Sequence, residues 1–313
     1  MKKLKEIISI CIVLIVLTGC STKAYIDYNN AIVKTESEKT GKQSIEIKLD
    51  IDFDTQGLSL EEVKLLNYYS EMMYQLTNKY DMDDDKIATD VYMNLGGIGL
   101  DSNYYKDGDE QYVKIPVLNK YINLTKEKFI NNEYNDIFKA VSDKWLDLLK
   151  EENVLKGNDT IVDTKEGQVK AKEVTINIQD EQLNELSKVI IDTIIDSGIL
   201  EDFIYVIDDE GNTDKIRKED VVEVINEAFS NLIFDSFEAK AYIDFDGYLI
   251  EENIEMNMRI SEKMNGKPIA IKLSFNNKYW DIGKKQVIDI PDIAEDDIIE
   301  MKELKDLDSI LGL

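Results

Sequence analysis

Apolar and polar residues alternate strictly along several stretches of the chain. In residues 44–53 every second position is apolar, namely Ile45, Ile47, Leu49, Ile51 and Phe53. Strict alternation places one row of side chains on a buried face and the other in water, as in a strand of an antiparallel sheet. The pattern returns in residues 237–245, 254–260 and 269–275. Both ends of the chain are therefore predicted to contribute long strands to a sheet.

Helical spacing of apolar residues marks the regions between these strands. Ser59 and Glu62 have the spacing of a capping box, and the apolar positions that follow predict a helix over residues 59–80. These positions are Leu66, Tyr69, Met73, Leu76 and Tyr80. Further helices are predicted in residues 126–152, from Asp180 onward, and in residues 221–232. Short strands are predicted in residues 87–95, 99–105 and 111–115.

A β-hairpin is predicted from residues 160–164 and 168–178, around the turn at Glu166 and Gly167. In its second strand the apolar residues switch from odd to even positions, and thus from one face of the strand to the other. Val169 and Ala171 are at odd positions, whereas Val174, Ile176 and Ile178 are at even positions. A β-bulge near Lys172 would bring both sets onto one face.

Strands at both ends with helices between them predict one α+β domain, although the length alone would allow two. The expected architecture is a single curved antiparallel sheet, a half-barrel, with helices packed on its concave apolar face. Residues 44–291 are assigned to this domain. Residues 292–313 are assigned to an acidic C-terminal tail with helical spacing.

The N-terminus has the pattern of a secretory signal peptide. A basic head (Lys2, Lys3 and Lys5) precedes an apolar run from Ile7 to Leu17. This run is shorter than the roughly 20 residues that a membrane-spanning helix needs. A charged head, a short apolar region and small residues before the cleavage point predict a signal peptide over residues 1–19. A buried core helix, the alternative, would show a polar face and caps.

The segment Leu17-Thr18-Gly19-Cys20 resembles the lipobox of bacterial lipoproteins. The resemblance implies cleavage before Cys20 and a thioether-linked diacylglycerol on its sulfur. Two acyl chains anchor a protein stably, whereas one is marginal. Residues 20–43 are then the lipidated anchor, a tether and a short helix. The expected location is the extracytoplasmic face of the cell membrane, with the membrane as a partner through this lipid.

The charge composition of the chain limits which classes of molecule it can bind. The chain has 37 basic and 64 acidic residues. Residues 1–19 hold three lysines and one glutamate, so the mature chain has 34 basic and 63 acidic residues and a net charge of −29. Such a charge argues against nucleic acid as a partner. It also disfavours direct adhesion to an anionic bilayer, which makes the lipid anchor more necessary.

Candidate catalytic chemistry is scarce. The chain has no histidine, which removes the usual general base and the commonest metal ligand. Cys11 leaves with the signal peptide and Cys20 is lipidated, so neither a disulfide nor a thiol nucleophile is expected. We therefore expect a non-enzymatic protein without a cofactor.

Two acidic clusters share some features with a calcium-binding loop but lack its spacing. Counted from Asp81, the sixth and twelfth positions of "DMDDDK" are Lys86 and Tyr92, where an EF-hand needs glycine and glutamate. The cluster at residues 208–212 also misplaces its glycine. Both are interpreted as solvated acidic turns and not as metal sites, with weak cation binding as the alternative.

The order of elements resembles lipoproteins of the LolA/LppX-like superfamily, which share a half-open β-barrel closed by helices. The lipobox, the strand 44–53, and the segments "AYIDFDGYLIEENIEMNMRI" and "KPIAIKLSFNNKYWDIGK" carry the resemblance, and the last two resemble clostridial and bacillary lipoproteins of this type. The resemblance implies an apolar cavity for acyl chains between sheet and helices. Candidate lining residues are Met73, Tyr69, Met256, Met258 and Phe245, with plain core packing as the alternative.

The expected function is binding of a lipid or another apolar envelope molecule. A cell-surface interaction or scaffold module without a ligand cavity is the alternative. A two-lobed solute receptor would need parallel strands, which the pattern does not predict.

Overall fold

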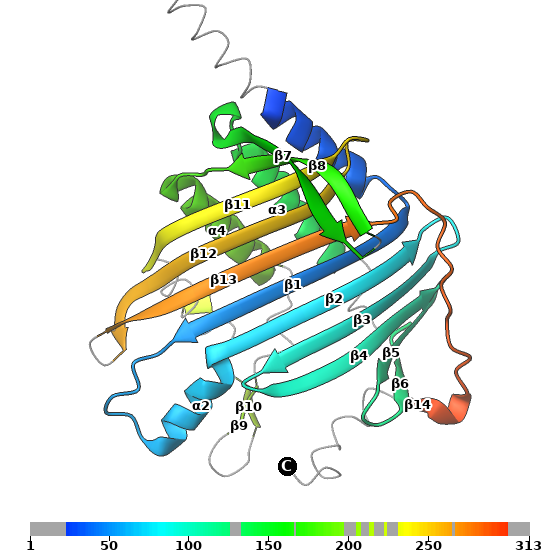
Figure 1. Cartoon of the computed structure of the whole chain (residues 1–313). Coiled ribbons are helices and arrows are strands. Elements are labelled where there is room, and N and C mark those ends of the chain that lie inside the picture. Colours follow the sequence, from blue (N-terminus) through cyan, green and yellow to red (C-terminus); the bar gives the residue numbers. More distant parts are fainter. Residues whose placement is uncertain are drawn as a thin grey trace, which may run out of the picture.

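A computed structural model describes residues 23–125, 133–165, 167–196, 205–207, 213–215, 222–223, 231–264 and 267–299. In this part of the chain twelve strands form one open sheet, in the order β14-β6-β5-β4-β3-β2-β1-β13-β12-β11-β8-β7 (Figure 1). The strands are β1 (Thr40–Asp52), β2 (Glu71–Asp81), β3 (Lys86–Leu95), β4 (Ile98–Asp107), β5 (Glu110–Ile115), β6 (Lys120–Asn123), β7 (Val154–Thr164), β8 (Gly167–Ile176), β11 (Leu232–Asp244), β12 (Leu249–Met264), β13 (Lys267–Trp280) and β14 (Ile298–Ile299). A separate pair consists of β9 (Tyr205–Ile207) and β10 (Thr213–Lys215).

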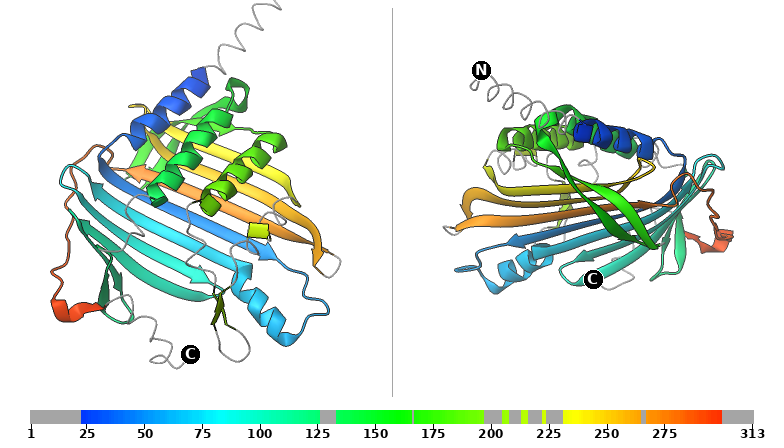
Figure 2. Two further views of the ribbon diagram at one scale, coloured as in Figure 1. Left: turned by 180° about the vertical axis from the view of Figure 1, so that it is seen from behind. Right: turned by 45° about the horizontal axis from the view of Figure 1, so that its top comes forward.

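Helices lie on one face of the large sheet and at one of its ends. The N-terminal helix of residues 23–36, α3 (Glu133–Leu148) and α4 (Asp180–Asp196) lie side by side across β11, β12 and β13 (Figure 2). We call the side of the sheet that carries them the helix-bearing face. A fourth helix, α2 (Leu60–Ser70), connects β1 to β2 at the far end of these strands (Figure 1).

The buried core lies between these three helices and the β7–β8–β11–β12 end of the sheet. Tyr28 and Ile32 from the N-terminal helix and Trp145 from α3 pack on this end. The strands contribute small or branched side chains, namely Val154, Val174, Ile176, Ala239, Ala241, Ile243 and Leu249. Alanines in β11 let the helices approach the sheet closely, so this part of the molecule is densely filled.

The predicted fold class, an α+β half-barrel with helices packed on the concave face of an antiparallel sheet, is wrong. The fold is dominated by a wide, open sheet, and its helices cover only one end of it. The sheet is also mixed, because β14 pairs in parallel with β6. The sheet is wider than expected for two reasons: residues 120–123, for which no strand is predicted, form β6, and two segments with helical spacing also form strands.

The first of these segments is residues 71–80. A helix is found where predicted up to Ser70, but the predicted continuation is wrong, because residues 71–81 form β2. Its apolar residues Met72, Tyr74 and Leu76 also fit a period of two. The backbone of β2 pairs with β1 on one side and with β3 on the other. If residues 71–81 were helical, this edge of β1 would have no strand to pair with, and its backbone N–H and C=O groups would lack partners.

The second segment begins the predicted C-terminal tail. Residues 295–297 form a turn of 3-10 helix, and Ile298 and Ile299 pair with Tyr121 and Ile122 of β6. Lys120 adds an ion pair to Asp297 at 3.4 Å. The start of the acidic segment therefore belongs to the sheet.

The β7–β8 hairpin is confirmed, but the bulge predicted near Lys172 is wrong. The irregularity lies in β7, between Lys156 and Asp159, whereas β8 pairs with β11 without interruption. The parity of β8 changes because this strand buries side chains on both faces. Val174 and Ile176 join the main core, whereas Ala171 packs with Val162 and Ile250 in a second, smaller core. The hairpin crosses the face opposite the helices (Figure 1), which we call the hairpin face.

Candidate functional site

The helix-bearing face stays apolar far beyond its helices. Directly opposed residues of paired strands lie on the same face of a sheet. Ile254 packs against the main core, so the residues directly opposed to it lie on the helix-bearing face. Two rows of opposed residues cross β12, β13, β1, β2, β3 and β4. They are Ile254, Phe275, Ile47, Tyr74, Met93 and Leu100, and Met256, Leu273, Leu49, Met72, Leu95 and Ile98. We call these two rows the apolar strip.

The apolar strip is incompletely covered by the described residues. None of its side chains belongs to the fully buried core, and three are exposed: Tyr74 at 37%, Leu100 at 48% and Ile98 at 53%. The other nine are half-buried. Monomeric soluble proteins rarely expose a contiguous apolar patch of more than a few hundred Å² unless it binds something. The apolar strip is therefore the candidate binding surface.

The structure separates the five residues that were predicted to line a pocket. Met256 and Met258 lie half-buried on the helix-bearing face of β12. Met73 lies on the opposite face of β2, across from Lys48. Tyr69 and Phe245 are exposed at 50% and 62%, in α2 and in the β11–β12 turn. These five side chains do not converge on one cavity.

Several residues of the apolar strip were missed by the sequence analysis. The alternation in residues 91–95 and 98–100 carries the necessary pattern, and the corresponding strands were predicted. The helix assigned to residues 71–80 concealed the connection, because β2 joins β3 and β4 to the long strand β1.

A buried hydrogen-bonded group holds the N-terminal helix on the sheet. The Tyr28 hydroxyl donates to the Glu252 carboxylate and accepts a hydrogen bond from Trp145 Nε1 at 3.0 Å. Two turns along the helix, the Thr35 hydroxyl accepts the backbone N–H of Leu249 at 2.9 Å. Burial raises the pKa of Glu252 above its usual range, and the charge of Glu36 adds to this effect.

Stability should therefore fall with rising pH as Glu252 ionises. A carboxyl whose pKa is raised in the folded state stabilises the fold below its unfolded-state pKa, and this contribution is lost as pH rises through the folded-state value. Glu252→Gln keeps a neutral hydrogen-bond acceptor. We expect the variant to match the parent protein near pH 4 and to be more stable than it at pH 8. Urea unfolding at both pH values measures this, and Glu255→Gln, an exposed position on the same strand, is the control.

The acidic turn between β2 and β3 is held by lysines. Lys39 pairs with Asp83 and Lys285 with Asp84, both at 2.9 Å, and Lys106 pairs with Asp85. Asp81 is buried and accepts the backbone N–H of Asp84 at 3.2 Å. Among the described residues no group of three or more ligand side chains could hold a metal ion. The cluster at residues 208–212 lies outside the described residues.

No family model matches the chain, and no curated protein matches it. Within the described ranges, no helix has the length and apolar character needed to cross a membrane.

Proposed function

We propose that this protein is a lipoprotein of the extracytoplasmic membrane face that holds the acyl chain of a lipid against the apolar strip. The observation that carries the proposal is the strip itself, with twelve apolar side chains on six neighbouring strands and none fully buried. The sequence places the anchoring Cys20 three residues before the first described residue of the N-terminal helix. That helix lies on the same face as the strip (Figure 2).

The shape and chemistry of the strip favour an acyl chain. Five strand spacings of about 4.8 Å give a strip about 24 Å long. The bilayer core, about 30 Å thick, contains two opposed layers of acyl chains, so the strip can accommodate a full chain. The tyrosine hydroxyl of Tyr74 is the only polar group in the two rows, and three methionines, Met72, Met93 and Met256, can adapt to a flexible ligand.

Electrostatics disfavours the other occupants of such a surface. A second copy of the chain would bring together two molecules of net charge −29, which repel each other. An anionic bilayer surface meets the same repulsion. A single lipid molecule adds few charges and can still bury the apolar side chains, each CH₂ contributing about 0.8 kcal/mol.

The proposal is tested by extracting lipid from the purified chain (residues 21–313, produced without the anchor) and identifying it by mass spectrometry. We expect about one equivalent of lipid. Met93→Glu should reduce it at least tenfold, because the new carboxylate lies in the middle of the strip and ionises poorly against an acyl chain.

Met73→Glu is the matched control, since Met73 is also half-buried but lies on the hairpin face opposite Lys48. It should retain the lipid. An extract without lipid, or equal loss in the two variants, would contradict the proposal. Cross-linking of another protein through the strip, with no lipid present, would favour the scaffold alternative instead.

A further inference from the structure

The helix-bearing face becomes polar on one side of the apolar strip. Next to the strip lies a third row of opposed residues, which is apolar in β1, β2 and β3 with Ile45, Leu76 and Val91. The fourth row crosses β13, β1, β2, β3 and β4 and consists of Tyr279, Gln43, Asn78, Thr89 and Tyr104. We call this fourth row the polar row. It gives the apolar strip a hydrogen-bonding border.

The amide of Asn78 keeps donors that the described residues do not use. Gln43 Nε2 donates to Asn277 Oδ1 at 3.0 Å and to the Tyr279 hydroxyl at 3.1 Å. The Thr89 hydroxyl donates to Asn78 Oδ1 at 3.0 Å and so fixes that side of the amide. Asn78 Nδ2 makes no hydrogen bond within the described part of the chain, and the residue is half-buried. An amide nitrogen offers two donors, so Asn78 can bind an acceptor oxygen of a ligand.

The face around the polar row is almost free of charge. In β1, β2, β3 and β4, which the structure describes throughout, Lys106 is the only charged side chain on the helix-bearing face, and it pairs with Asp85. Burial, followed by the charge of Asp85, raises the pKa of Tyr104 to about 12. An anionic group placed on the polar row would therefore find no free cation in these strands, and its burial would be costly.

The spacing of the rows lets one lipid molecule reach both the apolar strip and the polar row. Four residues of β2 separate Tyr74 in the strip from Asn78, which corresponds to about 13 Å along the strand. The third row lies between them, where Leu76 can contact the methylene groups nearest to the lipid head. A chain on the strip and a head on the polar row can thus belong to the same molecule.

We propose that the polar row receives the head of the lipid held by the apolar strip, and that this head is uncharged, with hydroxyl or ester oxygens as in a diacylglycerol. The inference rests on the proposed function and names the class of lipid. Hydroxyl and ester oxygens accept hydrogen bonds from an amide such as that of Asn78. A phosphate would add negative charge to a face without a free cation, in a chain of net charge −29.

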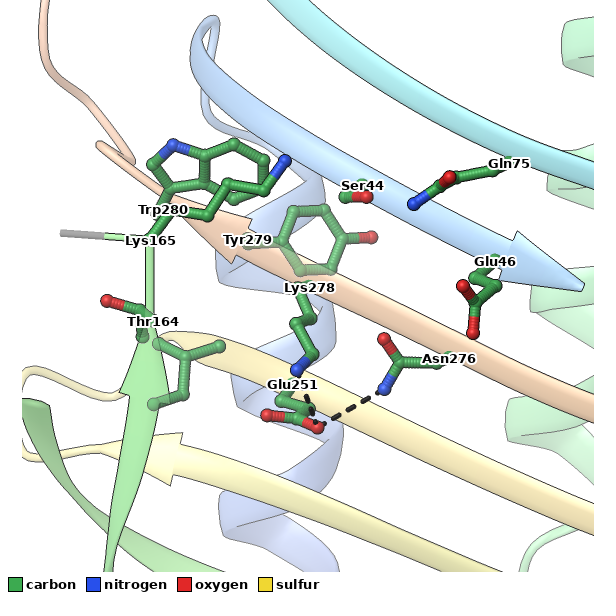
Figure 3. A pocket seen from close by; sticks show the side chains of 11 residues that line it. Ser44, Glu46, Gln75, Thr164, Lys165, Glu251, Asn276, Lys278, Tyr279 and Trp280 are labelled. Atoms are coloured by element: carbon green, nitrogen blue, oxygen red, sulfur yellow. Dashed lines mark hydrogen bonds and ion pairs between the residues drawn. The ribbon is translucent and has the colours of Figure 1, made fainter. Parts of the chain in front are cut away.

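The opposite face of β2 offers a matched position for a control. Gln75 is half-buried on the hairpin face, three residues from Asn78. It lines a pocket of about 250 Å³ beneath the tip of the β7–β8 hairpin (Figure 3). Two carboxylates of this pocket are already paired, Glu251 with Lys278 at 3.4 Å and Glu46 with Lys48 at 2.6 Å. A substitution at Gln75 therefore alters the same strand without changing the polar row.

The test offers the chain two lipids that differ only in a phosphate. Residues 21–313, produced without the anchor so that they separate from vesicles, are incubated with phosphatidylcholine vesicles containing equal amounts of dioleoylglycerol and dioleoyl phosphatidic acid. Gel filtration isolates the protein, and mass spectrometry measures the bound lipids. We expect about tenfold more dioleoylglycerol than phosphatidic acid. Asn78→Lys should reverse most of this preference, because the lysine supplies the missing cation. Gln75→Lys adds the same charge to the hairpin face and should leave the preference unchanged.

Two results would overturn the inference while leaving the proposed function in place. One is a preference of the parent chain for phosphatidic acid or phosphatidylcholine over dioleoylglycerol, after correction for their amounts in the vesicles. The other is an equal change of preference in Asn78→Lys and Gln75→Lys. A chain that binds no lipid at all would contradict the proposed function, and this inference with it.

Discussion

Cys20→Ala is expected to leave the protein as an uncleaved, unlipidated precursor and to abolish its anchoring by lipid. The sulfur of Cys20 is the proposed attachment point, and alanine has no nucleophile to accept the diacylglycerol. Loss of two acyl chains removes the part of the molecule that holds it stably at a membrane. Membrane fractionation, and the intact mass of the protein, measure the effect.

Cys11→Ala is the matched control for this experiment. Cys11 lies inside the apolar run of the predicted signal peptide, where alanine preserves the apolar character. This variant should mature normally. A Cys20→Ala protein of normal mature mass would contradict the interpretation of the whole N-terminus, including residues 1–19 as a signal peptide.

Tyr28→Ala is expected to destabilise the folded chain by at least about 4 kcal/mol. Among the residues that the structure describes, Tyr28 is the largest fully buried side chain, at 0% exposure. Removing a buried aromatic ring costs about 3–5 kcal/mol, and the buried Glu252 and Trp145 Nε1 would also lose their shared partner. Urea unfolding of residues 21–313, followed by circular dichroism, gives the free energy of unfolding.

Two further variants separate the causes of this loss. Tyr28→Phe keeps the ring and should cost about 1–3 kcal/mol, the penalty for unsatisfied buried polar groups. Tyr25→Ala removes a tyrosine from the same helix at a half-buried position and should cost less than Tyr28→Ala. If Tyr25→Ala and Tyr28→Ala were equally destabilising, the buried hydrogen bonds of Tyr28 with Glu252 and Trp145 would not be a major source of stability.

The Tyr28 contact also connects the two proposed parts of the function. The N-terminal helix follows Cys20, the proposed anchor, within a few residues and is fixed to β12 through Glu252 and Leu249. If Cys20 carries the proposed lipid, a short connection and a fixed helix would limit how the sheet can turn relative to the membrane. The apolar strip, on the same face, would then stay on the side of the sheet from which the anchor emerges.

The period-two pattern predicted most of the long strands because it is a local property of the backbone. Strand β1 was expected at residues 44–53 and is found at Thr40–Asp52, and β3, β4 and β5 lie close to their predicted ranges. Residues 71–80 were assigned wrongly because Leu66, Tyr69, Met73, Leu76 and Tyr80 also satisfy a helical period. A short segment that fits both periods is decided by its neighbours.

The candidate sites were less predictable than the strands. Met256 and Met258 were placed correctly on the apolar side of β12, since alternation reveals parity. Met73 was placed on the wrong face, because its assigned helix gave it a different set of neighbours. The pocket beneath the tip of the β7–β8 hairpin could not be expected at all, since it requires the hairpin of residues 154–176 to lie over strands of residues 40–81 and 249–280.

The sequence by itself determined the proposed N-terminal anchor motif, the net charge, the absence of histidine chemistry and the alternating strands, because each depends only on residue identity or on spacing of a few residues. The tertiary structure alone decided how wide the sheet is, which rows of apolar side chains lie together and which part of the sheet the helices cover. Ile47 of β1, for example, is paired with Tyr74 of β2 on one side and with Phe275 of β13, 228 positions along the chain, on the other. Pairing across such separations depends on backbone hydrogen bonds and packing summed over the whole sheet, which no local pattern contains.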